Sequence, residues 1–305
     1  MNIFKKHTLL KLLSIFSVVR GYNIALILLA QYLTSIFILS PGSTLLDVLL
    51  DLYLFAIVLA TLGAVASGYI INNFYDQEKD LINRPQKFIL DQVVSQQTKL
   101  KLYFILNFLV LLAASAISFR AVLFFVCYIF SIWFYSHKIK KMPIVGNLTS
   151  ALLSIVPFFA IFLYFQNYNQ LIFVFGFYLF LILAMRELIK DLENIKGDLA
   201  LNYQTVPVIY GERSTKLMIT VFVFINISIS LILVLNFDLG LMDYFFWGSI
   251  LTLIITLLMT WETSSIKQYH RIHNILKVLI FLGVLSIILL DPALIINKIF
   301  WRDQL

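Results

Sequence analysis

Charged residues are scarce in this chain. Only 13% of its 305 residues are charged, and 61% are hydrophobic. Soluble domains carry about a quarter of their residues as charges, so this composition excludes a soluble globular protein. The sequence is that of a membrane protein, with 28 Phe among its apolar residues.

Cysteine, proline and glycine are also few. The single Cys127 excludes an intrachain disulfide. The 6 Pro and 11 Gly form no Gly/Ser-rich linker, and no polar stretch is long enough for a soluble domain. We therefore expect one transmembrane unit over residues 1–305.

Long apolar runs are abundant instead. Each is about long enough to cross a ~30 Å hydrocarbon core as a helix. The runs lie near residues 18–40, 52–74, 101–118, 121–136, 147–165, 170–189, 217–236, 243–261 and 274–297. They predict an all-α polytopic fold with nine transmembrane helices. Residues 1–23 are basic and amphipathic and predict a surface helix before the first span, while Arg120 marks a tight hairpin between the third and fourth.

Positive residues gather on one side of the predicted membrane. With nine spans, the N-terminus and every second loop share a side, and that side holds all of the 23 Lys and Arg except Arg120, Lys298 and Arg302. The positive-inside rule then predicts a cytoplasmic N-terminus in the cytoplasmic (inner) cell membrane. The same bias accounts for the net charge of +7, so no nucleic-acid partner is needed to explain it.

The second span ends in a polar cluster within "NNFYDQEKDLINRP". Asn72, Asp76 and Asp80 are spaced by four residues and share one face of a helix. Arg84 and Lys87 follow closely. Charged side chains at a membrane boundary cost free energy, so such a cluster indicates a functional site.

The sixth span ends in a second cluster, "RELIKDLENIKGD", which contains the cations Arg186 and Lys190. Four polar residues follow an i, i+4, i+7, i+11 pattern on one helix face: Glu187, Asp191, Asn194 and Asp198. The second and sixth spans are four crossings apart, so they run parallel and end on the same side, which we expect to be cytoplasmic.

Two facing carboxylate clusters repel each other unless a cation lies between them. Hard oxygen ligands suit Mg²⁺, which is usually shared with substrate phosphates. A lipid diphosphate fits, with Lys and Arg on its remaining oxygens and its tail among the spans. Aromatic faces among the spans can stabilise an allylic cation after diphosphate leaves. The expected metal ligands are Asn72, Asp76, Asp80, Asp191 and Asp198, and the expected catalytic residues are these four Asp and Lys190.

These two clusters resemble the aspartate motifs of the UbiA-type intramembrane prenyltransferases. The segments "RGYN", "FYSHKIKKMPIVGN" and "TVPVIYGE" are similar to further segments of that family. The resemblance implies nine helices around a central cavity, open to lipid, under a cytoplasmic cap. It also implies substrate contacts by Arg20, Asn23, Asn72, Asn73, Arg84, Lys87, Tyr135, Lys138, Lys140, Asn147, Arg186, Glu187 and Asn194.

The residues and spacing of the second motif most resemble those of the geranylgeranylglyceryl-phosphate geranylgeranyltransferases, which form an ether to a glycerol phosphate. The basic loop with Lys138, Lys140 and Lys141 would suit such an anionic acceptor. An aromatic acceptor, as in quinone pathways, is the alternative. A transporter is a further hypothesis, although the acids lie at one rim rather than mid-membrane, and an inactive lipid-diphosphate binder is another.

The chain departs from the family motifs at Asn73 and Asn194, where Asp is usual. Each Asn removes one negative charge but keeps a carbonyl oxygen that can bind a metal. We expect Asp at either position to strengthen Mg²⁺ binding, unless both Asn belong to a subfamily tuned otherwise. His137, His270 and His273 fit no metal-ligand spacing and are expected at the surface.

Overall fold

Helices make up almost all of the described chain, which comprises residues 3–40, 42–262 and 264–292 of the computed structural model. The α-helices are α1 (Ile3–Val18), α2 (Gly21–Thr34), α3 (Leu45–Leu49), α4 (Leu52–Tyr75), α5 (Gln77–Asn83), α6 (Pro85–Asp91), α7 (Gln96–Ser115), α8 (Phe119–His137), α9 (Val145–Phe165), α10 (Gln170–Ala200), α11 (Val206–Asn236), α12 (Asp243–Glu262) and α13 (Ile266–Ser286). Short π or 3₁₀ turns are η1 (Ser35–Leu39), η2 (Ile139–Lys141), η3 (Gly240–Met242) and η4 (Ile287–Leu290).

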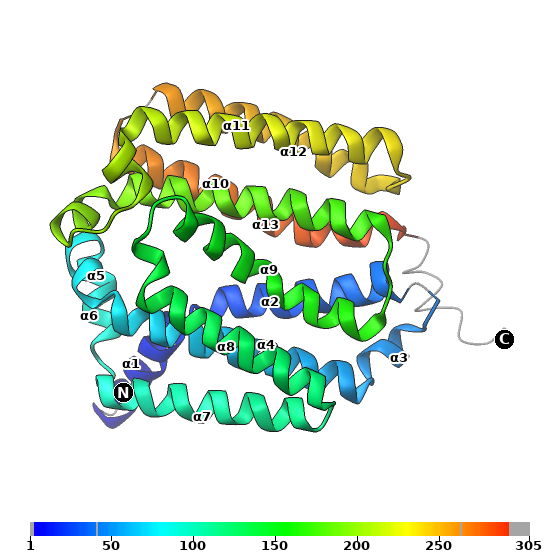
Figure 1. The fold of residues 1–305 in the computed structure, drawn as a ribbon. Helices are drawn as coiled ribbons and strands as arrows, with labels where there is room; N and C mark the ends of the chain where they lie inside the picture. Colours follow the sequence, from blue (N-terminus) through cyan, green and yellow to red (C-terminus); the bar gives the residue numbers. More distant parts are fainter. Residues whose placement is uncertain (1–2, 41, 263, 293–305) are drawn as a thin grey trace.

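Nine helical segments of the described chain are long and apolar enough to cross a membrane, which confirms the expected number of spans. Several of them begin earlier than their apolar runs, most of all the seventh, at Val206 rather than 217, and the ninth, at Ile266 rather than 274. A search for apolar runs misses such polar first turns, because helices continue beyond the hydrocarbon core. The long helices lie side by side, and α1, α5 and α6 gather at one end of the bundle (Figure 1).

The third and fourth spans form the expected tight hairpin. Helix α7 ends at Ser115 and α8 begins at Phe119, with Arg120 in the first turn. Ser118 caps α8 by accepting a hydrogen bond from the backbone N–H of Ala121 at 3.1 Å. This cap satisfies one of the backbone donors that every helix start leaves free.

Glycines let two neighbouring helices approach α4 closely. A Cβ atom on Gly63 would lie 2.7 Å from Val110 of α7, and one on Gly68 would lie 2.8 Å from Ile132 of α8. Small residues at such contacts are typical of membrane helices, which associate by close packing rather than by the hydrophobic effect. The packing holds α4, which carries the first acidic cluster.

The second acidic cluster lies on the longest span. Helix α10 has 31 residues, so it is about 46 Å long at 1.5 Å per residue and exceeds a ~30 Å hydrocarbon core. Its C-terminal turns therefore extend beyond the core, where charged side chains are tolerated. These turns pack against α5 at the same end of the bundle (Figure 1).

Pro157 interrupts the hydrogen bonding of α9 inside the membrane. Proline has no N–H, so the carbonyl of Leu153 loses its helical donor. The Tyr128 hydroxyl of α8 donates to this carbonyl at 3.0 Å, and Gln31 of α2 donates to the Pro157 carbonyl at 2.9 Å. The first bond satisfies the carbonyl that the proline leaves without a helical donor, and the second ties α2 to α9.

Tyr128→Phe should therefore lower the thermal unfolding midpoint in detergent, because it leaves the Leu153 carbonyl without a donor at a cost of about 1–2 kcal/mol. Adding Pro157→Ala restores the helical N–H, so the double variant should lose less stability than the two single changes together. Tyr168→Phe, at a side chain 64% exposed, is the matched control. A Tyr128→Phe protein as stable as this control would contradict the assignment.

Candidate active site

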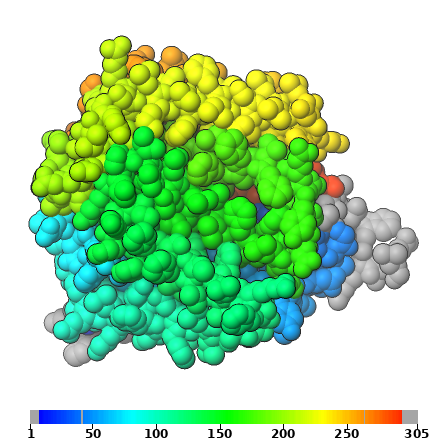
Figure 2. Space-filling view, in the orientation of Figure 1, coloured from blue at the N-terminus to red at the C-terminus, as the bar shows by residue number. Residues whose placement is uncertain are grey.

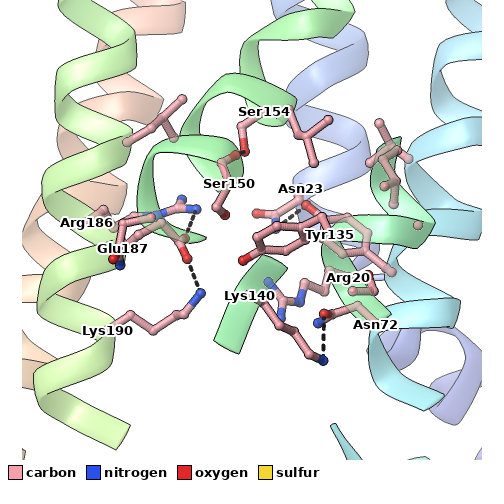
Figure 3. A pocket seen from close by; sticks show the side chains of 18 of the residues that line it. Arg20, Asn23, Asn72, Tyr135, Lys140, Ser150, Ser154, Arg186, Glu187 and Lys190 are labelled. Atoms are coloured by element: carbon pink, nitrogen blue, oxygen red, sulfur yellow. Dashed lines mark hydrogen bonds and ion pairs between the residues drawn. The ribbon is translucent and has the colours of Figure 1, made fainter. Parts of the chain in front are cut away.

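A cavity of about 260 Å³ lies among α2, α4, α8, α9, α10 and α13, and its polar end contains side chains from both acidic clusters. Figure 3 shows Asn72 on one side and Glu187 and Lys190 on the other, with Lys140 and Tyr135 between them. Members of the clusters that line it are Asn72, Asp76, Asp80, Glu187, Asp191 and Asn194. The two clusters therefore face one shared space.

Asp76 lies where α4 ends and α5 begins. Its backbone leaves the helical conformation at φ −97° and ψ 8°, and its side chain points into the cavity. Lys140 of η2 lies 2.6 Å from the Asp76 carboxylate and also donates to Asn72 Oδ1 at 3.4 Å. Burial opposes ionisation of Asp76, but Lys140 and Lys79 outweigh it and hold the pKa of this carboxyl below its usual range. Asp76 is therefore a carboxylate at neutral pH.

The second cluster is held by neighbours on two helices. Asn147, in the first turn of α9, donates to Asp191 Oδ2 at 2.7 Å. Lys190 and Arg186 both pair with Glu187, the latter at 3.4 Å. Asp191 thus has a partner on α9, and Glu187 has two partners on its own helix. Arg186 and Lys190 also line the cavity.

Asp198 lies beyond the cavity. Its side chain is fully buried, pairs with Lys79 of α5 and accepts a hydrogen bond from Thr205 at 3.2 Å. Lys79 also lies over the ring of Tyr203, with its Nζ 5.0 Å from the ring centroid. Asp198 therefore ties α5 to α10 and does not line the cavity.

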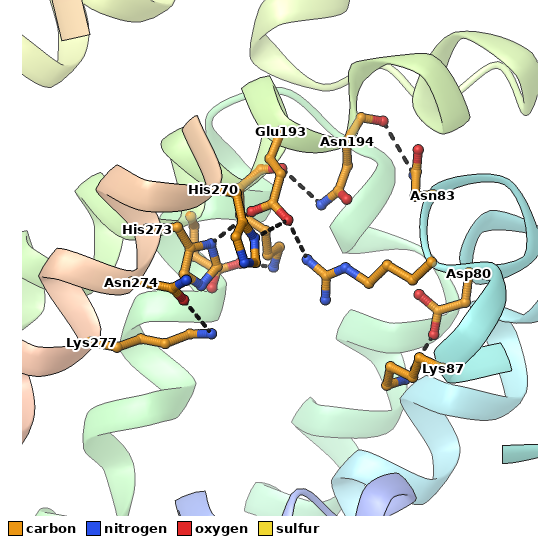
Figure 4. Close-up of polar contacts among 12 residues, drawn as sticks. Asp80, Asn83, Lys87, Glu193, Asn194, His270, His273, Asn274 and Lys277 are labelled. Atoms are coloured by element: carbon orange, nitrogen blue, oxygen red, sulfur yellow. Dashed lines mark hydrogen bonds and ion pairs between the residues drawn. The ribbon is translucent and has the colours of Figure 1, made fainter. Parts of the chain in front are cut away.

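Helix α5 docks on α10 through close contacts. Asn83 donates to the Asn194 carbonyl at 3.3 Å and accepts from the Gly197 N–H at 3.2 Å. Arg84 pairs with Glu193 at 3.2 Å. These contacts hold α5, and Asp80 with it, next to the second cluster (Figure 4).

Two histidines of α13 also contact Glu193, the partner of Arg84. His270 and His273 approach Glu193 through their Nδ1 atoms at 3.0 and 3.2 Å (Figure 4). His270 is exposed as expected, but His273 is only 5% exposed, so its expected surface position is wrong. It is buried because α13 packs against α10 at this level.

Aromatic side chains and one arginine form the wall opposite α10. The Arg20 guanidinium lies 4.9 Å from the ring centroid of Tyr69, and Asn23 donates to the Tyr69 hydroxyl at 3.0 Å. Tyr128 and Tyr135 also line the cavity. Aromatic ring faces attract cations, so this wall of the cavity can stabilise a positively charged group that lies between the two clusters.

A second, larger cavity of about 420 Å³ adjoins the first. It lies among α2, α9, α10, α12 and α13, and its lining is almost wholly apolar. Residues that line both cavities are Ala30, Phe158, Leu179, Ile280 and Val284. Figure 2 shows that the face formed by the green helices is hollowed near its middle. Together the cavities offer a polar end and a long apolar end.

Most of the residues expected from the sequence line the polar cavity: Arg20, Asn23, Asn72, Asp76, Asp80, Arg84, Tyr135, Lys140, Asn147, Arg186, Glu187, Lys190, Asp191 and Asn194. Asn73, Lys87, Lys138 and Asp198 do not, so the structure does not place them at a substrate. Asn73 is buried between Asp91 and Lys99, while Lys138 is exposed.

Several polar side chains that line the cavity were not among the residues expected from the sequence, and they include Tyr69, Lys79, Ser150 and Ser154. Tyr69 lies three residues before Asn72 and Lys79 three residues after Asp76, so helical spacing carried the signal for both. The two serines lie on one face of α9 and had no signal that separates them from ordinary helix-contact residues.

Comparison with known proteins decides the family. A model described as the UbiA prenyltransferase family matches residues 28–285. The chain belongs to this family. It is therefore a multi-pass membrane prenyltransferase, as the motifs predict.

Its relatives include proteins named digeranylgeranylglyceryl phosphate synthase. The one from Methanobrevibacter smithii is 27% identical over 213 residues, which cover 66% of this chain and 70% of the relative. The one from Thermococcus gammatolerans is 26% identical over 225 residues, covering 73% and 80%. The one from Methanosphaera stadtmanae is 32% identical over 173 residues, covering 55% and 63%.

Solved structures share the fold of this UbiA-family protein. A structure of digeranylgeranylglyceryl phosphate synthase superposes with a TM-score of 0.68 at 19% identity, covering 91% of this chain and 97% of that one. A UbiA homolog from Archaeoglobus fulgidus bound to DMAPP and Mg²⁺ gives 0.65 at 15% identity, covering 90% and 99%. These likenesses confirm the all-α fold.

The oxygen donors at the polar end fit Mg²⁺. Asn72, Asp76, Asp80 and Asp191 supply carboxylate and amide oxygens, the hard ligands this ion prefers. Among the described residues, no group of three or more His, Cys, Asp or Glu could hold a metal by itself. This donor set suits Mg²⁺ bound by one or two carboxylates and completed by water and substrate phosphates.

Gly197→Ala should displace α5, because a Cβ there would lie 2.3 Å from Asn83 Nδ2. The Asn83 side chain would have to move and lose its two hydrogen bonds to α10, worth about 1 kcal/mol each. We expect a lower unfolding midpoint and a roughly tenfold lower turnover.

Gly248→Ala in α12 is the control, because its Cβ would meet nothing within 4 Å and Gly248 lines neither cavity. It should be neutral or slightly stabilising, since Ala favours helix by about 1 kcal/mol over Gly. If the two variants behaved alike, the docking of α5 on α10 would not matter for turnover.

Proposed function

We propose that this protein transfers a geranylgeranyl-type prenyl group from its allylic diphosphate to the hydroxyl of a lipid glycerol phosphate, forming an ether. The observation that carries the proposal is the joined cavity, with acids and cations at one end and an apolar chamber at the other. The relatives named digeranylgeranylglyceryl phosphate synthase support this acceptor.

The charge of the polar cavity favours anionic substrates. Six cationic side chains line it: Arg20, Lys79, Arg84, Lys140, Arg186 and Lys190. Four acidic side chains oppose them: Asp76, Asp80, Glu187 and Asp191. The surplus of positive charge suits a diphosphate donor and a phosphate-bearing acceptor better than a neutral phenol.

The chain's own residues bind and orient the donor. Lys140 and Lys190 reach into the cavity from opposite sides and can donate to diphosphate oxygens (Figure 3). Mg²⁺, bound by one or two of the carboxylates of Asp76, Asp80 and Asp191, would neutralise the negative charge that grows on the leaving diphosphate. The apolar chamber takes the prenyl tail and keeps water from the reacting carbon.

The transfer exchanges one carbon–oxygen bond for another. The allylic C1–O bond breaks and its electron pair leaves with the diphosphate. The acceptor hydroxyl oxygen donates a pair to C1 and releases its proton, which gives an ether, diphosphate and H⁺. Tyr69 and Tyr135 line the cavity near both clusters, where their ring faces can stabilise the positive charge that develops on the allylic carbons.

The orientation follows from charge. The topology predicted from the sequence puts all but three of the 23 Lys and Arg on the side of the N-terminus and the acidic clusters, which favours a cytoplasmic active site in the cytoplasmic membrane. Both aspartate clusters and α1 lie at this end of the bundle (Figure 1).

Product analysis tests the proposed reaction. Purified protein with Mg²⁺ should join geranylgeranyl diphosphate to geranylgeranylglyceryl phosphate and leave phenolic acceptors unreacted. Asp76→Ala and Asp191→Ala should lower turnover more than tenfold, because each removes a carboxylate that faces the donor. Each change also removes the partner of a buried side chain, so the unfolding midpoints should fall, and turnover is compared at a temperature where the variants are folded. Prenylation of a phenol in place of the glycerol phosphate would contradict the proposed acceptor.

Labelling with a membrane-impermeant thiol reagent tests the orientation. Cys127 is free and exposed, so the variants are made in a Cys127→Ser background. Lys138→Cys should react only from the cytoplasmic side and Asp238→Cys only from outside, because these exposed residues lie at opposite ends of α8–α11. The reverse pattern would overturn the orientation.

A further inference from the structure

A line of polar contacts runs from α7 to the first acidic cluster. Lys99 donates to Asn73 Oδ1 at 3.0 Å, and Asn73 donates to Asp91 Oδ2 at 2.9 Å. Lys87 lies 2.9 Å from the same Asp91 oxygen and 3.0 Å from Asp80 Oδ2. The line thus joins α7, α4, α6 and α5 and ends at a carboxylate that lines the cavity.

Three members of this line are buried. Asp91 is 2% exposed, Lys99 3% and Asn73 7%. Buried charges are tolerated only when they are paired and hydrogen-bonded. Lys87 and Lys99 balance Asp80 and Asp91 in charge, so the line is neutral as it stands.

The amide of Asn73 suits its place in this line. It accepts from Lys99 with its oxygen and donates to Asp91 with its nitrogen. A carboxylate has no proton to donate at neutral pH, so Asp at this position would set two negative oxygens against each other. The presence of Asn instead of the family's usual Asp at position 73 is therefore explained by its hydrogen bonds to Lys99 and Asp91, not by a contact with the cavity.

The surface helix α1 holds the other side of Asp91. Ser17 donates to Asp91 Oδ1 at 2.8 Å, and Ser14 donates to the Asp91 carbonyl at 3.4 Å. The Asp91 carboxylate thus receives hydrogen bonds on both oxygens, from Ser17 of α1, Asn73 of α4 and Lys87 of its own helix α6. Such a carboxylate has little freedom to move.

We propose that Asp91 is a positioning residue for the first acidic cluster: it holds Lys87 beside Asp80, and Asn73 belongs to this buried line rather than to the substrate site. Asp91 also balances the charge of Lys87. Without Asp91, the net charge beside Asp80 is more positive by one unit. The resulting positive potential opposes the binding of a divalent cation at Asp80. The proposal rests on the proposed function, in which Asp80 faces Mg²⁺ and the diphosphate.

Calorimetric binding of a prenyl thiodiphosphate across a Mg²⁺ series tests this, with no acceptor present. Asp91→Asn should raise the Mg²⁺ concentration for half-maximal binding by roughly tenfold, because one nearby negative charge is lost. Asn73→Asp should lower the unfolding midpoint measured without Mg²⁺, because it places a second carboxylate against Asp91. Asp238→Asn, which removes an exposed acid at the other end of the bundle, is the matched control.

The exchange Asn73→Asp with Asp91→Asn is the decisive variant. It swaps the carboxylate and the amide within one hydrogen-bonded pair and restores the net charge. Both the Mg²⁺ requirement and the unfolding midpoint should return to within about threefold and a few degrees of the unaltered protein. A merely structural role for Asp91 would change the midpoint without changing the Mg²⁺ requirement.

An unchanged Mg²⁺ requirement in Asp91→Asn would overturn the positioning role, and an unchanged unfolding midpoint in Asn73→Asp would overturn the place of Asn73 in the buried line. Both results leave the proposed function intact. If the unaltered protein did not bind the thiodiphosphate at any Mg²⁺ concentration, the proposed function itself would fail, and this proposal with it.

Discussion

Pairing of buried carboxylates is the constraint on which this site depends. Asp76 has Lys140, Asp191 has Asn147 and Asp198 has Lys79. An unpaired buried charge would cost several kcal/mol, and each of these partners comes from a different segment. Satisfying the acids therefore brings α5, η2 and the start of α9 together around α10, and the polar cavity is the space that remains.

The membrane strengthens this constraint. Helices in lipid gain little from burying apolar side chains, so close packing and satisfied polar groups hold the bundle together. Gly63 and Gly68 bring α7 and α8 close to α4, while Tyr128 and Gln31 donate hydrogen bonds to the backbone around Pro157. That frame keeps an apolar chamber open beside the charged end, where a substrate with a charged head and a long tail can lie across both.

The sequence predicted the spans and the faces of the two clusters. Apolar runs gave the nine spans, and spacing by four residues placed Asn72, Asp76 and Asp80 on one wall of one cavity. The spacing did not predict how far along the helix axis each residue lies from the cavity. Asp198 shares a face with Glu187 but lies three turns further along α10, which carries it past the cavity to Lys79.

Rotation by one residue explains the other main difference. Asn73 follows Asn72 directly, so its side chain points about 100° away, toward α7 and Asp91. A motif comparison places it with the substrate contacts, and only tertiary packing shows that Lys99 and Asp91 use both ends of its amide. Lys138 and Lys140 differ likewise, because the η2 turn sends Lys140 inward and leaves Lys138 exposed.

The central claim is that the two clusters share one divalent ion and one diphosphate. A crystal structure with Mn²⁺ and a prenyl thiodiphosphate tests it most directly through the anomalous signal of the metal. The account predicts a peak in the polar cavity between Asp76 and Asp191, with the prenyl tail in the apolar chamber. A metal bound outside this cavity, or a diphosphate held by one cluster alone, would contradict it.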